Sequence, residues 1–235
     1  MKKPFVIDKC ANCTARVDSV FSDLNGEQLE ELSKEKGCNY YKKGQTIFFE
    51  GNKSHGIYCV HHGKIKMHKL GSGGKEQIVR FAKDGDVLGY RALLSGEAFS
   101  ASATVLEDTS VCYIPKETLL GFIQKDPSFS LKVLELTCKE IGKTTEMVTN
   151  LAQKPVRERL AEVLLMLKET FGLTADNEID VPLSREDLAN IVGTATESVI
   201  RLLSEMKKEG TISLSGKKIV INDVQELMRI SQLYE

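Results

Sequence analysis

The chain has 235 residues, of which 41% are hydrophobic and 28% charged, and its formal net charge is −1. These values are ordinary for a globular protein, and the length suffices for one large or two small domains. No apolar run reaches the roughly 20 residues of a membrane span, and residues 1–13 lack the apolar core of a signal peptide. We therefore expect a cytoplasmic protein with no membrane partner. Six cysteines in a reducing compartment favour metal ligands or buried thiols over disulfides.

A β-rich region is predicted over residues 22–125, after a cysteine-containing segment at residues 1–21. Short runs rich in β-branched and aromatic residues lie between frequent glycines, and the clearest runs are residues 46–49, 56–60, 64–69, 77–81 and 110–114. Several alternate apolar and polar residues, as half-buried strands do. Many short strands at close spacing predict a jelly roll or small barrel. The amphipathic residues 26–36 are expected to cap it as a helix.

A long helix is predicted over residues 126–153. Asp126 is a capping residue, and Pro127 suits the first helical position. Six uncharged residues then recur at intervals of three and four, namely Leu131, Leu134, Cys138, Ile141, Thr145 and Val148. This narrow seam favours pairing with the same helix of a second copy, whereas packing on the chain's own β domain usually requires a wider apolar stripe. Pro155 breaks the helix and marks a hinge.

Residues 154–235 are predicted to form a second domain with a helix-turn-helix. An amphipathic helix at 156–171 ends at Gly172. Ser184 and Asp187 then form a capping box for a short helix at 185–192, and Gly193 suits the left-handed turn that follows. A second helix begins at Thr194 or Thr196 and runs to residue 208, and residues 212–221 predict a two-stranded wing.

The second helix is predicted to enter the major groove of DNA. The expected base-reading residues are Thr196, Glu197, Ile200 and Arg201, because arginine matches guanine, glutamate matches cytosine and an apolar side chain matches the thymine methyl group. Glu197 and Arg201 are also spaced to hold each other in place. The expected phosphate contacts are Ser184, Arg185, Ser198, Lys217 and Lys218. Residues 154–235 contain 11 Lys+Arg against 14 Asp+Glu, so their positive charge must gather on one face. A solvated helical ion pair is the alternative interpretation of Glu197 and Arg201.

These segments together resemble the Crp/Fnr family of bacterial transcription regulators, over nearly the whole chain. The resemblance includes Lys43-Gly44-Gln45-Thr46-Ile47-Phe48, Asp84-Gly85-Asp86-Val87-Leu88-Gly89, Cys112-Tyr113-Ile114-Pro115 and the helix-turn-helix. It implies an α+β fold, with an N-terminal cyclic-nucleotide-binding-like β-roll (jelly roll), a dimerisation helix and a C-terminal winged helix-turn-helix. It also implies a homodimer on an inverted-repeat site in double-stranded DNA, and RNA polymerase as a further partner.

The resemblance argues against a cyclic-nucleotide ligand. In the cyclic-AMP-binding members, a Gly-Glu-Leu turn and a later Arg-Ser pair hold the ribose and phosphate, but here these positions read Gly89-Tyr90-Arg91 and Phe99-Ser100. The anchoring glutamate and arginine are therefore absent. Gly89, Tyr90, Arg91 and Ser100 are retained as a candidate effector pocket, because Arg91 supplies one cation.

The cysteines resemble those of oxygen-sensing Fnr members, which bind a [4Fe-4S] cluster through three N-terminal cysteines and a distant fourth. Cys10 and Cys13 form a C-x2-C pair, and Cys112 lies where these members place the distant ligand. The third N-terminal position reads Ser19, so Cys38 is the candidate substitute and Cys59 a weaker one. Zinc and plain buried thiols are alternatives. Haem, which some relatives bind, would use histidines from the set His55, His61, His62 and His68, although solvated histidines are the simpler interpretation.

The sequence thus predicts a DNA-binding transcription regulator whose affinity for DNA responds to a redox, gas or small-ligand signal at the β-roll. The alternatives are an effector-binding module that acts through a protein partner, and a cyclic-nucleotide-responsive regulator. No enzyme is predicted, because no Ser/His/Asp, Cys/His or P-loop pattern is present.

Overall fold

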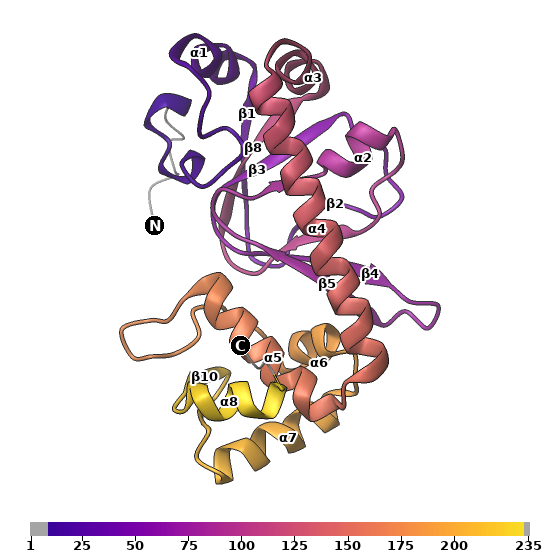
Figure 1. Cartoon of the computed structure of the whole chain (residues 1–235), viewed down its shortest axis with the longest axis vertical. Helices are drawn as coiled ribbons and strands as arrows, with labels where there is room; N and C mark the ends of the chain where they lie inside the picture. The colour runs from indigo at the N-terminus through magenta and orange to yellow at the C-terminus, as the bar shows by residue number, and fades with distance from the viewer. Residues whose placement is uncertain (1–8, 233–235) are drawn as a thin grey trace. The chain divides into compact units, whose positions relative to one another are not determined.

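The computed structural model describes residues 9–232, which form two compact units (Figure 1). The first unit contains the described residues up to Lys69 together with Arg80–Gly142. The second contains Leu70–Val79 and the residues from Lys143 onward. The division between Gly142 and Lys143 falls inside a single long helix, so this helix contributes to both units.

Two four-stranded sheets form the β-roll, with the strand orders β1-β8-β3-β6 and β2-β7-β4-β5. The strands are β1 (Gly37–Tyr41), β2 (Thr46–Phe48), β3 (Gly56–His62), β4 (Ile65–Leu70), β5 (Glu76–Ala82), β6 (Val87–Leu88), β7 (Ser102–Val105) and β8 (Thr109–Pro115). The five runs expected from the sequence correspond to β2, β3, β4, β5 and β8, so the predicted roll is confirmed. The sequence pattern missed β1, β6 and β7, of which β1 is exposed along most of its length and lacks an apolar alternation.

The first unit has two apolar cores. One contains Phe48, Val60, Ile65, Leu88 and Phe99, among other buried side chains of the two sheets. In this core the rings of Phe48 and Phe99 stack with their centroids 4.0 Å apart. The other core lies among the N-terminal segment, the helices and β3 and β8, and includes Phe21, Leu32 and Phe129. Burial of these side chains is the main favourable contribution to folding.

Four helices belong wholly or partly to this unit, namely α1 (Gly26–Glu35), α2 (Tyr90–Ser95), α3 (Lys116–Lys125) and α4 (Pro127–Gln153). The predicted start of α4 is confirmed, because the Asp126 carboxylate accepts hydrogen bonds from the backbone N–H groups of Ser128 and Phe129 at 3.0 and 3.1 Å. These bonds satisfy two of the helix's otherwise unpaired donors. Helices α2 and α3 were not predicted.

Helix α4 presents two unlike faces. Phe129 and Val133 are buried, and Leu136 packs against the same core. The six seam residues from Leu131 to Val148 are all exposed, with Ile141 61% and Val148 62% accessible. Since an α-helix turns by about 100° per residue, the two sets fall on different sides. The seam therefore does not pack on the β domain of its own chain.

Glu140 joins the middle of α4 to the β-roll. Its carboxylate accepts a hydrogen bond from the Tyr90 hydroxyl at 2.6 Å and forms an ion pair with Arg80 of β5. The Tyr90 side chain is buried, and burial together with the hydrogen bond to Glu140 raises the pKa of its phenol. This tyrosine is therefore a neutral donor to a carboxylate.

The second unit contains α5 (Val156–Phe171), α6 (Arg185–Val192), α7 (Thr196–Lys208), β9 (Ile212–Ser215), β10 (Lys218–Ile221) and α8 (Val224–Ser231). Leu160, Leu164, Leu167, Leu188 and Leu203 form its buried centre. The predicted break at Pro155 is confirmed, because α4 ends at Gln153 and α5 begins at Val156. Helix α8 was not predicted. Among the described residues, no helix is both long enough and apolar enough to cross a membrane.

Replacement of Tyr90 by phenylalanine tests the contact with Glu140. We expect Tyr90→Phe to lower the free energy of unfolding by about 1.5–3 kcal/mol, the usual contribution of a hydrogen bond to a charged group. Tyr41→Phe is the control, because burial raises the pKa of the Tyr41 phenol and, within residues 9–232, no carboxylate accepts a hydrogen bond from it. Urea denaturation measures both variants. If Tyr90→Phe is as stable as Tyr41→Phe, the hydrogen bond from the Tyr90 hydroxyl to Glu140 contributes little to stability.

Candidate functional site

The turn between α6 and α7 is fixed by a capping box and a glycine. The Ser184 hydroxyl oxygen accepts a hydrogen bond from the Asp187 N–H at 3.0 Å, and the Ser184 N–H donates to the Asp187 carboxylate at 3.0 Å. At the other end of α6, Gly193 has φ of 72°, a left-handed conformation that side chains disfavour. The predicted capping box and glycine turn are confirmed, and α7 begins at Thr196.

Arg159 of α5 also holds this turn, and the sequence analysis missed it. Its guanidinium donates to the carbonyl oxygens of Val192 at 2.9 Å and Gly193 at 3.3 Å. Carbonyl groups at a helix C-terminus lack partners within the helix, so a cation there is favourable. Arg159 lies more than 30 positions before Val192 and Gly193, and no local pattern in the sequence connects it to them.

The exposed face of α7 carries the predicted base-reading residues. Val199, Leu202, Leu203 and Met206 are buried, which turns Glu197, Ile200 and Arg201 to the surface. Thr196 and Ser198 are half-buried. The expected pairing of Arg201 with Glu197 is wrong, because the Arg201 guanidinium lies 2.7 Å from Glu205, one helical turn further along. The Arg201 side chain therefore points towards the C-terminal end of α7, away from Glu197.

The wing is a hairpin of β9 and β10 that turns at Gly216. Arg185, at the start of α6, donates to the carbonyl oxygens of Gly216 at 2.9 Å and Lys217 at 3.3 Å, so it fastens the wing to the helix-turn-helix. Burial lowers the pKa of this guanidinium. Lys217 is exposed, and Lys218 forms an ion pair with Glu178 at 2.7 Å. The phosphate contacts expected of these residues stay predictions.

The residues of the candidate effector pocket differ in their burial. Tyr90 is buried against Glu140, whereas Arg91 and Ser100 lie on the surface. Gly89 has φ of 84°, and a Cβ there would lie 2.9 Å from the Phe99 ring. Gly89 and Tyr90 therefore take part in the packing of the β-roll and α4, and the effector pocket stays a prediction.

Three cysteines form a row across one sheet. Cys38 of β1 lies directly opposite Cys112 of β8, and Cys112 lies opposite Cys59 of β3. The Sγ atoms of Cys38 and Cys112 are 3.8 Å apart. Cys38 is exposed and Cys112 is buried. The structure thus brings the proposed substitute ligand, Cys38, to the proposed distant ligand.

Cys10 and Lys36 lie in the same region. Cys10 is buried, and its N–H donates to the Ser33 hydroxyl at 2.8 Å. Burial raises the pKa of Cys112 to about 12, although the Lys36 ammonium opposes this shift. Burial disfavours the charge on Lys36, but Cys112, Cys10 and Cys38 favour it and raise its pKa overall. The Lys36 ammonium therefore lies near all three thiols.

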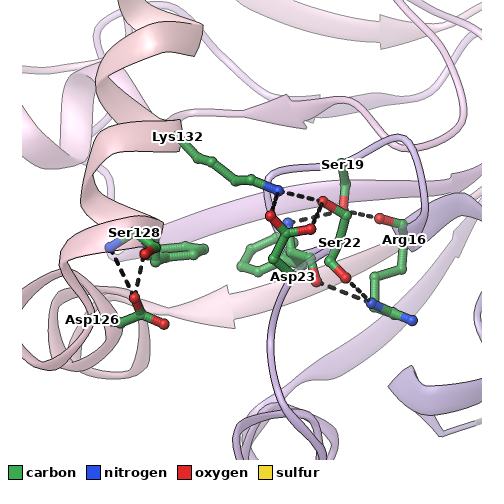
Figure 2. A network of polar contacts seen from close by, with 9 residues as sticks. Arg16, Ser19, Ser22, Asp23, Asp126, Ser128 and Lys132 are labelled. Carbon is green, nitrogen blue, oxygen red and sulfur yellow. Dashed lines mark hydrogen bonds and ion pairs between the residues drawn. The ribbon is translucent and has the colours of Figure 1, made fainter.

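Ser19, at the position of the missing third cysteine, is part of a turn. Its hydroxyl donates to the Arg16 carbonyl at 2.7 Å and accepts from the Phe21 N–H at 3.1 Å. Figure 2 shows how this turn continues to α4. Arg16 donates to the Ser22 carbonyl at 2.6 Å, and Lys132 of α4 donates to the Ser22 hydroxyl at 2.6 Å.

Both polar and apolar contacts attach the N-terminal segment to α4. Lys132 also forms an ion pair with Asp23, which lowers the pKa of that carboxyl. Beside it the rings of Phe21 and Phe129 stack with centroids 5.6 Å apart. The segment that bears Cys10 and Cys13 is therefore fastened to the first turns of α4. No local pattern in the sequence marks Asp23 or Lys132.

The thiols suit an iron–sulfur cluster by their chemistry. Within residues 9–232, no three Cys, His, Asp or Glu side chains meet closely enough to hold one metal ion as they stand. A four-thiolate zinc site needs every sulfur about 2.3 Å from one ion, so it would require rearrangement. In a [4Fe-4S] cluster each cysteine binds a different iron, so the thiols surround a volume. Cys10, Cys38 and Cys112, grouped around Lys36, provide soft donors of this kind.

Comparison with known proteins identifies both halves of the chain. Residues 38–126 match the cyclic nucleotide-binding domain and residues 158–230 the Crp-like helix-turn-helix domain. The chain is 30% identical over 226 residues to the "Anaerobic regulatory protein" of Aggregatibacter actinomycetemcomitans, which covers 94% of this chain and 87% of that protein. It is 30% identical over 225 residues to the "Fumarate and nitrate reduction regulatory protein" of Escherichia coli (strain K12), covering 94% and 90%. The structure of FixK2 from Bradyrhizobium japonicum aligns with a TM-score of 0.75 and 28% identity, over 83% of this chain and 96% of that chain.

A β-roll domain, a long helix and a helix-turn-helix with a wing define a class of DNA-binding transcription regulators. The chain belongs to the Crp/Fnr family within this class. The fold and family expected from the sequence are therefore confirmed.

Proposed function

We propose that this protein binds an inverted-repeat DNA site as a homodimer, and that a redox or gas signal at the cysteine-bearing end of the first unit sets its affinity. The observation that carries the DNA-binding part is the division of α7 into a buried side and an exposed side with Glu197, Ile200 and Arg201. The same DNA partner argues for the cytoplasm as its location. Contact with RNA polymerase is proposed by analogy with the family alone.

Base recognition by α7 combines a hydrogen-bonding and an apolar contribution. The Arg201 side chain is 66% exposed and long enough to bond guanine O6 and N7 together. Its ion pair with Glu205 holds the guanidinium in place before DNA binds and is itself weak, because both groups are partly solvated. Ile200, 49% exposed, offers a surface for a thymine methyl group. Ser184, Arg185, Ser198, Lys217 and Lys218 are proposed to position the unit on phosphates.

Arg201→Ala tests this assignment. We expect the variant to lose about 1–3 kcal/mol of discrimination at one G·C pair in duplexes that the wild-type protein selects from a random pool. Arg229→Ala is the matched control, because Arg229 is also an exposed helical arginine paired to a glutamate, in α8. Titrations at fixed salt compare selected and G·C-substituted duplexes. If Arg201→Ala and Arg229→Ala discriminate equally, α7 does not read bases through Arg201, and absence of binding to any duplex at low salt would favour a protein partner.

The exposed seam of α4 supports homodimerisation. Four large apolar side chains on it, Leu131, Leu134, Ile141 and Val148, are between 56% and 62% exposed in the single chain. Cys138 and Thr145 complete the stripe without adding charge. Exposure of so many large apolar groups on one helix is unfavourable in water, and a second copy of α4 would bury them by coiled-coil packing. Two copies would also present two α7 helices to an inverted repeat.

Leu134→Glu is expected to weaken the dimer. Two symmetry-related carboxylates would face each other in an apolar seam, so we expect the dissociation constant to rise at least about tenfold, or about 1.4 kcal/mol. Leu94→Glu makes the same change at an exposed leucine of α2 outside the seam and should leave the dimer unchanged. Sedimentation velocity over a concentration series measures both. A dimer that tolerates Leu134→Glu as well as Leu94→Glu would place the interface elsewhere.

For the signal, we propose a [4Fe-4S] cluster ligated by Cys10, Cys13, Cys38 and Cys112. When bound, such a cluster supplies reactivity towards oxygen that side chains alone lack. The chain's own contribution is to hold the thiols and to keep a cation, Lys36, beside the thiolates that ligation requires. The names of the anaerobic and the fumarate and nitrate reduction regulators support a signal of this class.

Anaerobic purification tests the cluster. We expect a brown protein whose visible absorbance and iron content are lost in air. Cys13→Ser should be colourless, whereas Cys138→Ser, which alters a thiol that is not a proposed ligand, should stay brown. Iron analysis of the three proteins, prepared side by side, gives the measurement. Wild-type protein that is colourless and iron-free under anaerobic conditions would exclude the cluster.

A further inference from the structure

In the row of cysteines on β1, β8 and β3, Cys38 and Cys112 face each other as a close pair. The proposed cluster uses both thiols as ligands but does not depend on this pairing. Residues directly opposite each other in antiparallel strands project to the same face of the sheet. Cys38 and Cys112 are such a pair, and Cys112 and Cys59 are another. All three thiols therefore share one face of the sheet.

Cys38 and Cys112 meet the geometric requirements of a disulfide. Opposite Cα atoms in antiparallel strands lie about 4.5 or 5.5 Å apart, and disulfides span Cα separations of roughly 4.4–6.8 Å. The Sγ atoms are already 3.8 Å apart. A bond of about 2.0 Å then requires mainly side-chain rotation, because the strand register already provides the backbone spacing.

Exposure assigns different roles to the two thiols. Cys38 lies on β1, at the edge of its sheet, and is open to solvent. Cys112 is only 7% exposed, in the strand between β1 and β3. A dissolved oxidant therefore reaches Cys38 first, and Cys112 is the nearest thiol in register to resolve the product.

We propose that Cys38 and Cys112 form a reversible cross-strand disulfide when the protein meets a hydroperoxide. The Cys38 thiol loses its proton, and the thiolate attacks the distal oxygen of the hydroperoxide. The O–O bond breaks, Cys38 becomes a sulfenic acid, and the leaving oxygen takes up the proton to give an alcohol, or water from hydrogen peroxide. Cys112 sulfur then attacks the Cys38 sulfur and releases water as the S–S bond forms. Two thiols lose two electrons in total, and the hydroperoxide gains them. A small dithiol reverses the reaction by exchange.

The disulfide has a consequence that rests on the proposed function. It occupies two of the four thiols assigned to the cluster, so the oxidised chain cannot use them to bind iron. It also links the edge strand β1 covalently to β8. Hydroperoxide would thus hold the protein in a form without the cluster until a reductant restores the thiols.

The test uses the full-length, iron-free protein, reduced and then treated with hydrogen peroxide. We expect non-reducing peptide mapping to recover the Cys38 and Cys112 peptides linked, with the mass lower by two hydrogen atoms, and dithiothreitol to separate them. Cys38→Ser, a change at an exposed position, should abolish the linked peptide. Cys138→Ser, which alters a thiol of the α4 seam outside the row of cysteines, should retain it.

Other products would overturn the proposal. These are a Cys10–Cys13 link, a chain-to-chain link, or a stable sulfenic or sulfinic acid on Cys38 with Cys112 still reduced. Cys13→Ser separates this proposal from the cluster, because that variant should lose iron binding yet still form the Cys38–Cys112 disulfide. Linked peptides in a protein that never binds iron would support the disulfide and exclude the cluster.

Discussion

The half-buried carboxylate of Glu140 helps to fix how α4 is rotated on the β-roll. A buried charge is costly unless it is paired and hydrogen-bonded, and here the Tyr90 hydroxyl and Arg80 satisfy it. Rotation of the helix by one residue, about 100°, would separate these partners and expose Phe129 and Val133. The opposite, apolar stripe from Leu131 to Val148 is thereby held outward. These polar contacts, together with the burial of Phe129 and Val133, thus leave the seam of α4 exposed.

A continuous set of contacts connects the cysteines to the same helix. The Cys10 N–H donates a hydrogen bond to Ser33 of α1. In the turn that follows Cys10 and Cys13, Arg16 donates to the Ser22 carbonyl, and Lys132 of α4 donates to the Ser22 hydroxyl (Figure 2). Coupling between sites requires a chain of packed or hydrogen-bonded groups of this kind together with an element that has two arrangements. The contacts provide the first requirement. A change in how Cys10 or Cys13 is bonded would act on the first turns of α4, where the seam begins.

The sequence predicted those parts of the fold that depend on neighbours in the chain. The capping box of Ser184 and Asp187, the left-handed Gly193 and the start of α4 at Asp126 are local patterns with a physical cause. The contacts of Glu140 with Tyr90, Lys132 with Ser22, and Arg159 with Gly193 join residues 50, 110 and 34 positions apart, and nothing in a single sequence pairs them. Local reasoning also chose the wrong partner for Arg201, because Glu197 and Glu205 are equally spaced from it on either side.

The contacts of the turn at Gly89-Tyr90-Arg91 favour the cysteines, rather than this turn, as the proposed site of the signal. Residues 38–126 retain the cyclic nucleotide-binding domain, yet the residues of its ligand turn have other tasks here. Tyr90 donates to Glu140, and the Phe99 ring lies so close to Gly89 that no side chain fits there. A ligand in that turn would have to displace the contacts that orient α4. The thiols around Lys36 lie instead at a segment that is held to α4 by half-buried polar groups and by the stacked rings of Phe21 and Phe129. The cluster proposed for the cysteines would therefore act on α4 through the contacts of the N-terminal segment.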